Sequence, residues 1–163
     1  MEEFKGPDSI EILWLESARD SAGNPTPKAR YEEIPRDWAR VDENDLAADA
    51  IRTADKLEHL SYLKRLVKES FENHRVDYRI WRDKLKAEYS SAKLPNGKSP
   101  SIDAVKGLVR CHEDYPGWYA VENRLVADEA YLADYRRDMG DKLAALKAVL
   151  YRREGEARRD PRN

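Results

Sequence analysis

Basic residues recur at helical spacing near the middle of the chain. Arg75, Arg79, Arg82 and Lys86 follow one another at steps of four, three and four residues, so a helix would place them on one face. Single-stranded DNA or RNA is bound by such cations along its phosphates, together with flat side chains against unstacked bases. We take this stretch as a candidate nucleic-acid-binding site. Its further members, in the same stretch and in the turn that follows, are Lys84, Tyr89, Lys93 and Lys98.

Two aromatic residues in this stretch allow two interpretations. Tyr78 and Trp81 lie among the cations, where they could stack on bases. They also continue an apolar stripe at helical spacing, which is typical of a buried packing face. The sequence leaves both roles open.

The segment Gly97-Lys98-Ser99 has the letters that end a phosphate-binding loop. Such a loop needs another glycine five residues before Gly97, where Ala92 stands, and a buried strand ahead of it. The charged run from Arg82 to Glu88 is not such a strand. We therefore do not expect an ATPase.

Residues suited to catalysis or metal binding are scattered. His59, His74 and His112 are isolated, and the adjacent Cys111 and His112 would point about 100° apart on a helix. No Glu-x-x-His pair and no zinc-like cysteine spacing occurs. We expect a non-enzymatic protein with no metal and no cofactor.

A long helix must carry the candidate site. No proline interrupts the chain between the candidate N-caps Asp42 and Asn44 and the next proline, Pro95, and we predict a helix from Asp45 to Ser90. Steps of three and four relate its apolar or semi-polar positions, which are Leu46, Ala50, Ala54, Leu57, Leu60, Leu63, Val67, Phe71, His74, Tyr78, Trp81 and Leu85.

The stretch Leu94–Ser101 reverses the chain. Its two prolines bar helix continuation, and Asn96-Gly97 is a ready left-handed turn. Ser99 or Ser101 can then cap a short helix, Ile102 to Cys111.

A second long helix follows, capped by Asp114 and running from about Tyr115 to Arg153 or beyond. Its stripe has one gap, at Asp128-Glu129, and Gly140 is a weak helical position. The apolar positions that form this stripe are Trp118, Val121, Leu125, Leu132, Tyr135, Met139, Leu143, Leu146 and Leu150.

The predicted fold is all-α. It is a long antiparallel helical hairpin with a short intervening helix (44–153), an acidic irregular arm (1–43) and a basic frayed tail (154–163). In the arm, Ile10–Leu15 could form one short strand, either paired with Lys28–Ile34 or with another subunit. Trp14 and Trp38 are expected to anchor the arm. Two helices leave much of each stripe uncovered, so we expect a homo-oligomer.

Composition narrows the class of protein. Charged residues make up 38% of the 163 residues, and the net charge of −2 divides into −7 for residues 1–50 and +5 for residues 51–163. This asymmetry fits polyanion binding by the basic part, or a merely solvated surface. The single cysteine, the lack of a membrane-spanning run and the lack of a secretory leader at the N-terminus indicate a cytoplasmic protein.

The segment Trp81-Arg-Asp-Lys-Leu-Lys-Ala-Glu-Tyr-Ser-Ser91, with the turn and helices after it, resembles the UvsY family of phage recombination mediators. The resemblance covers about Asn44 to Arg153 and rests on order, length and scattered residues. In this chain Ser91 or Ala92 replaces the family's glycine at the helix end, and residues 1–43 have no counterpart.

The resemblance implies a ring-like homo-oligomer that binds single-stranded DNA. Such a mediator helps to load a RecA-like recombinase onto strands covered by single-strand-binding protein, in the host cytoplasm if the protein is phage-encoded. The family's basic stretch carries over to Arg82, Lys84 and Lys86, with the two lysines matching best, and its aromatic residue to Tyr89.

Two other functions remain open. A non-catalytic helical oligomeric scaffold or adaptor with no nucleic-acid binding would explain the long stripes and the acidic arm equally well. A DNA-mimicking inhibitor that uses the acidic arm is the weaker hypothesis, because prolines and aromatic residues break that segment.

Overall fold

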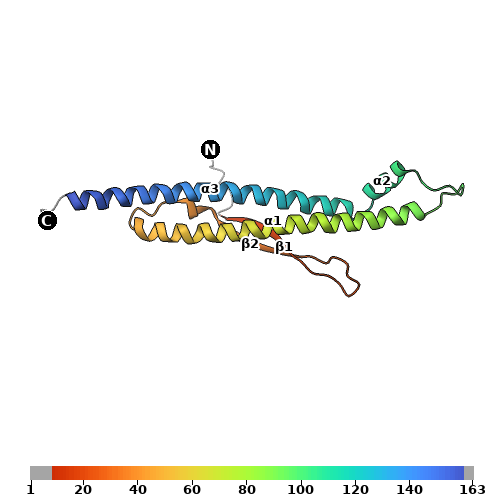
Figure 1. Cartoon of the computed structure of the whole chain (residues 1–163), viewed down its shortest axis with the longest axis horizontal. Coiled ribbons are helices and arrows are strands. Elements are labelled where there is room, and N and C mark those ends of the chain that lie inside the picture. The colour runs from red at the N-terminus through yellow and green to blue at the C-terminus, as the bar shows by residue number, and fades with distance from the viewer. Residues whose placement is uncertain (1–8, 160–163) are drawn as a thin grey trace, which may run out of the picture. The chain divides into compact units, whose positions relative to one another are not determined.

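The computed structural model describes residues 9–159, and most of them are helical (Figure 1). The predictions for residues 1–8 and 160–163, in the arm and the tail, lie outside the described residues. The elements in chain order are β1 (Ser9–Glu16), β2 (Lys28–Pro35), the short 3-10 helix η1 (Arg36–Ala39), α1 (Leu46–Ser91), α2 (Ile102–Arg110) and α3 (Tyr115–Arg159). In the part of the chain that is described, no helix has a stretch apolar and long enough to cross a membrane.

The all-α prediction is wrong for the N-terminal arm, which folds into two strands and η1. β1 pairs with β2 in a small antiparallel sheet. The connecting turn contains Gly23 at a φ of 81°. The Asp20 carboxylate accepts hydrogen bonds from the amides of Ala22 and Asn24 at 2.9 and 2.8 Å. Pairing supplies the backbone hydrogen bonds that a lone strand would lack.

The boundaries of α1 and α2 agree closely with the predicted ones, while α3 continues to Arg159 and so includes residues 154–159 of the predicted tail. α1 starts one residue later and ends one residue later than expected, and its N-cap is Asp45, whose carboxylate accepts from the Ala48 amide at 3.0 Å. Asp42 and Asn44 are therefore not the cap. The Ser101 hydroxyl caps α2 by accepting from the Ala104 amide at 3.2 Å.

The chain divides into two compact units. The described part of unit 1 comprises residues 9–13, 31–66 and 128–159. Its fully buried apolar side chains come from both strands and both long helices, and they are Ile12, Ile34, Leu60, Leu63, Leu132 and Met139. The stripe predicted for α1 shifts at its start, because Thr53 is buried while Ala54 is exposed.

A buried ion pair holds the connection before α1 in unit 1. Lys142 Nζ lies 2.9 Å from the Asp49 carboxylate and also donates to the carbonyl oxygens of Trp38 and Arg40. Burial alone would raise the pKa of Asp49, but the hydrogen bonds from Lys142 and the Asp42 amide and the charges of Lys142 and Arg52 together lower it.

Unit 2 comprises residues 14–30 and 67–127. Its buried apolar side chains are Val67 of α1, Val105 and Val109 of α2 and Leu125 of α3. The buried Ser70 hydroxyl accepts a hydrogen bond from the Leu15 amide of β1 at 2.8 Å and lies 3.2 Å from the Leu15 carbonyl oxygen. This hydroxyl therefore occupies the edge of β1 at Leu15.

The gap in the stripe of α3 has a structural reason. Asp128 is buried in unit 1, and its carboxylate accepts a hydrogen bond from the Leu13 amide at 2.8 Å. A strand edge meets the helix at this position, so a polar acceptor stands where the pattern calls for an apolar side chain.

Candidate nucleic-acid interface

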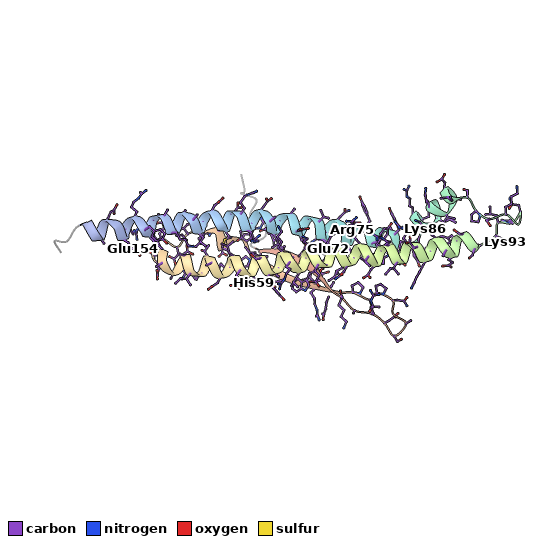
Figure 2. All side chains as sticks on the ribbon, in the orientation of Figure 1. His59, Glu72, Arg75, Lys86, Lys93 and Glu154 are labelled. Carbon is purple, nitrogen blue, oxygen red and sulfur yellow. The ribbon has the colours of Figure 1, made fainter. Side chains whose placement is uncertain are left out.

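The four evenly spaced cations of α1 lie along two neighbouring hollows in unit 2. The first hollow, of about 170 Å³, is lined by Arg75, Arg79 and Arg82 together with Tyr78 and Glu122. We call the four cations Arg75, Arg79, Arg82 and Lys86 the α1 basic face; Figure 2 labels Arg75 and Lys86 on α1. Because α1 is continuous from Leu46 to Ser91, the helical spacing of these four cations places them on one surface.

Aromatic rings support the arginines of this face. The Arg75 guanidinium lies over the Phe71 ring, 5.5 Å from its centre, and that of Arg82 lies 5.9 Å from the centre of the Tyr78 ring. Arg82 also contacts the Asp83 carboxylate at 3.1 Å. Arg75 and Arg79 are exposed, so their charges are open to a bound anion.

A second hollow, of about 260 Å³, lies beyond Arg82, and we call it the α2 hollow. Arg82 and Lys86 of α1 line it. Lys106 and Arg110 of α2 line it as well, and the remaining lining residues are Tyr78, Val109 and Tyr115. The structure thus brings four cations from two helices together around one space.

Sequence reasoning missed the two cations of α2. A signal was present, since Lys106 and Arg110 are four residues apart on a nine-residue helix and so share a face. Their proximity to Arg82 and Lys86 could not be read from spacing, because it depends on where the segment 92–101 returns the chain.

Lys84 does not join this surface. Its Nζ donates to Asn24 Oδ1 at 2.8 Å, and it lines a separate hollow of about 220 Å³ with Asn24, Pro25, Ile80, Trp81 and Trp118. Two residues along a helix correspond to a rotation of about 200°, so Lys84 lies away from both Arg82 and Lys86. The α1 basic face therefore lacks one of the two lysines that the family resemblance favours most.

The remaining predicted residues lie at or beyond the end of α1. Tyr89 is half-buried on the last turns of the helix. Lys93 and Lys98 are exposed in the segment between α1 and α2, and Figure 2 labels Lys93 past the helix end. The Leu94 amide donates to the Lys98 carbonyl at 2.9 Å, and Gly97 adopts a φ of 78°, as the sequence predicts for this turn. These three residues line neither basic hollow.

The aromatic residues of the stretch form an internal cluster. Trp81 lies against Trp118 of α3, with ring centres 5.6 Å apart, and edge-on to His112 at 5.4 Å. Tyr78 lies 5.9 Å from the Trp118 ring. The buried His74 donates from Nε2 to the Trp118 carbonyl oxygen at 2.9 Å. These contacts give Tyr78 and Trp81 a packing role.

An apolar hollow of about 550 Å³ adjoins this cluster. Trp81 and Trp118 form part of its wall, and Leu15, Pro25 and Pro27 contribute from the N-terminal arm. Its carboxylates, Glu113 and Asp114, come directly before α3 in the chain. This composition suits an apolar group, not a phosphate.

The described residues show no arrangement for metal chemistry. Within residues 9–159, no group of three or more His, Cys, Asp or Glu side chains could hold a metal ion. His59 contacts Glu32, and His112 lies 3.6 Å from Asp114 as a separate pair. Comparison of the chain with protein-family models, with curated proteins and with solved structures finds no match.

Proposed function

We propose that this protein binds single-stranded DNA through the α1 basic face. The carrying observation is that Arg75, Arg79, Arg82 and Lys86 line two adjoining hollows that share Tyr78 and Arg82. A phosphate chain laid along α1 would meet a cation at each turn, and counterion release would drive its binding. Lys93 and Lys98 extend the basic charge past the end of the helix.

The role that we propose for this binding is that of a non-enzymatic recombination mediator in the cytoplasm. By the resemblance to the UvsY family, it helps to load a RecA-like recombinase onto strands covered by single-strand-binding protein. The resemblance runs through Trp81–Ser91, the segment that carries Arg82 and Lys86.

We also propose that the two long helices form a hairpin and that the protein assembles into a homo-oligomer. In unit 1, Asp49 contacts Lys142, and Ser61 contacts Arg136. Residue numbers thus rise along α1 while those of their partners fall along α3, which supports antiparallel helices. Apolar side chains that a second copy could cover are exposed on both long helices of this unit, and they include Ile51, Tyr62, Val149 and Tyr151.

The test is a salt titration of binding to fluorescent single- and double-stranded oligonucleotides, with light scattering on the same samples. We expect an oligomer that binds single strands with a steep salt dependence. The double variant Arg82→Ala/Lys86→Ala should lower the slope of log K against log salt by about 1.4, because each contact contributes about 0.7. Lys147→Ala/Arg152→Ala removes two exposed cations of α3 and is the matched control.

Two results would contradict the proposal. One is the absence of single-strand binding by the wild type at low salt. The other is an equal loss of affinity in the target and control variants, which would show that net charge alone decides binding.

A scaffold or adaptor with no nucleic-acid affinity is the second candidate. It is favoured by the packing of Trp81 against Trp118 and His112, which leaves fewer aromatic faces for bases. Oligomerisation without binding to either kind of oligonucleotide at any salt concentration would support it.

A further inference from the structure

The α2 hollow has the chemistry of a phosphate site. Its four cations come from two helices, so positive charge approaches the same space from more than one direction. Val109, which is 3% exposed, forms an apolar part of its lining. An anion with several oxygens can accept from more than one of these cations at once, as phosphate does.

Weak ion pairs leave much of this charge available. Asp83 contacts both Arg82 at 3.1 Å and Lys86 at 3.9 Å, and Asp103 contacts Lys106 at 3.3 Å. Both carboxylates are largely exposed, and such pairs are readily exchanged for another anion.

Arg110 adds a fourth cation, whose charge no carboxylate among the described residues pairs with. Among residues 9–159 it forms no ion pair, although its charge acts on the nearby Tyr78 hydroxyl. Four cations therefore face two carboxylates at this hollow, of which Asp83 contacts two cations and Asp103 one, which leaves a surplus of positive charge.

The two tyrosines supply neutral donors and flat surfaces. Burial, followed by the nearby Tyr115 hydroxyl, raises the pKa of Tyr78, while the charges of Arg82 and Arg110 oppose the rise. The phenol is thus protonated at neutral pH and can donate a hydrogen bond to a phosphate oxygen. Its ring, like that of Tyr115, lines the hollow beside the cations.

The α2 hollow adjoins the hollow lined by Arg75 and Arg79. The two hollows share Tyr78 and Arg82, and Arg79 and Lys86 stand about 10 Å apart along α1 at 1.5 Å per residue. A ligand that occupies both must therefore be extended and carry more than one negative group.

We propose that the α2 hollow binds one internal phosphate of a single strand whose backbone continues along α1 into the neighbouring hollow. Lys106 and Arg110 contact this phosphate from α2, opposite Arg82 and Lys86. The inference rests on the proposed function, and it adds α2 as the second wall of the binding track.

The experiment compares Lys106→Ala/Arg110→Ala with the control Lys147→Ala/Arg152→Ala in binding to a fluorescent oligothymidylate. Both cations of α2 are exposed, so the variant should keep its fold, which circular dichroism checks. We expect at least a tenfold loss of affinity near 0.1 M salt and a salt slope lower by about 1.4. Lys106→Gln/Arg110→Gln, which keeps polar side chains of similar length, should show the same loss and serves if the alanine variant is unstable.

A second arm separates an internal phosphate from a strand end. Oligonucleotides with a 5′-phosphate and with a 5′-hydroxyl should bind equally well. A preference for the 5′-phosphate that disappears in the α2 variant would overturn the continuous track.

The failures of the two proposals are distinguishable. If Arg82→Ala/Lys86→Ala weakens binding while Lys106→Ala/Arg110→Ala matches its control, the inference about α2 is wrong and the proposed function stands. If the wild type binds no single strand, the proposed function fails, and the inference fails with it.

Discussion

The Nζ atom of Lys84 lies 2.8 Å from the Oδ1 atom of Asn24, so this lysine is held by the turn between β1 and β2. Lys86, two residues further, lines the α2 hollow instead. The two lysines that match the family resemblance best thus have different surroundings.

The first prediction separates these two lysines. Lys86→Ala should lower the salt slope of single-strand binding by about 0.7, as the loss of one phosphate contact does, whereas Lys84→Ala should leave it unchanged. Equal effects of the two substitutions would contradict the assignment of the basic face. Asn24→Ala is a useful companion, because it releases Lys84 without removing its charge.

The second prediction concerns the aromatic cluster. Trp81→Ala should lower the free energy of unfolding by about 2–4 kcal/mol, because the ring contacts both Trp118 and His112. Urea unfolding measures this change. Tyr119→Ala is the control, since Tyr119 is 59% exposed and should change stability by about 0.5 kcal/mol or less. A Trp81→Ala variant of unchanged stability that no longer binds DNA would show that the residue stacks on bases instead.

The third prediction concerns the buried ion pair of unit 1. Lys142→Met should cost about 3–5 kcal/mol of unfolding free energy, because it leaves the Asp49 carboxylate buried without its cation. Adding Asp49→Asn should recover part of this loss. If Lys142→Met is no worse than Lys147→Met, a change at an exposed position, the pair has no stabilising role.

The same pair predicts a response to acid. The pKa of Asp49 is lower in the folded protein than its ordinary value of 3.8. The stabilisation is therefore complete above about pH 4 and is lost as the pH falls through the lowered pKa. Unfolding free energies measured from pH 6 to pH 2 should fall less steeply in Asp49→Asn than in the wild type. Equal slopes would contradict this linkage.

The fourth prediction uses two glycines with opposite backbone requirements. Gly140 lies within α3, and a Cβ atom there would meet nothing within 4 Å, so Gly140→Ala should stabilise the protein by about 1 kcal/mol. Gly97 has a φ of 78°, and Gly97→Ala should destabilise it by about 1 kcal/mol despite equally open space. Thermal unfolding of both variants provides the measurement, and shifts of the same sign would refute the argument.

Local patterns were sufficient to predict the helices. The prolines, the cap at Ser101 and the stripe of apolar residues place α1 and α2 within one residue of their observed bounds. The strand Ile10–Leu15 was also visible in the sequence. Its partner was only one of several options, because strand pairing depends on the rest of the fold.

The membership of the candidate site was predictable only in part. The spacing of Arg75, Arg79, Arg82 and Lys86 follows from one continuous helix. The position of Lys84 depends on Asn24, which is 60 residues away in the sequence, and no local pattern reports such a contact. The cations of α2 were missed for the same reason.

The hydrogen bond from the Leu13 amide to Asp128 joins residues 115 positions apart. During synthesis β1 is made early, while its acceptor on α3 is added about 6–23 s later at translation rates of 5–20 residues per second. Throughout this interval the amide of Leu13 must be satisfied by water or by another partner. The docking of β1 at Asp128 is therefore a late event in the folding of a nascent chain, although the strand belongs to its first residues.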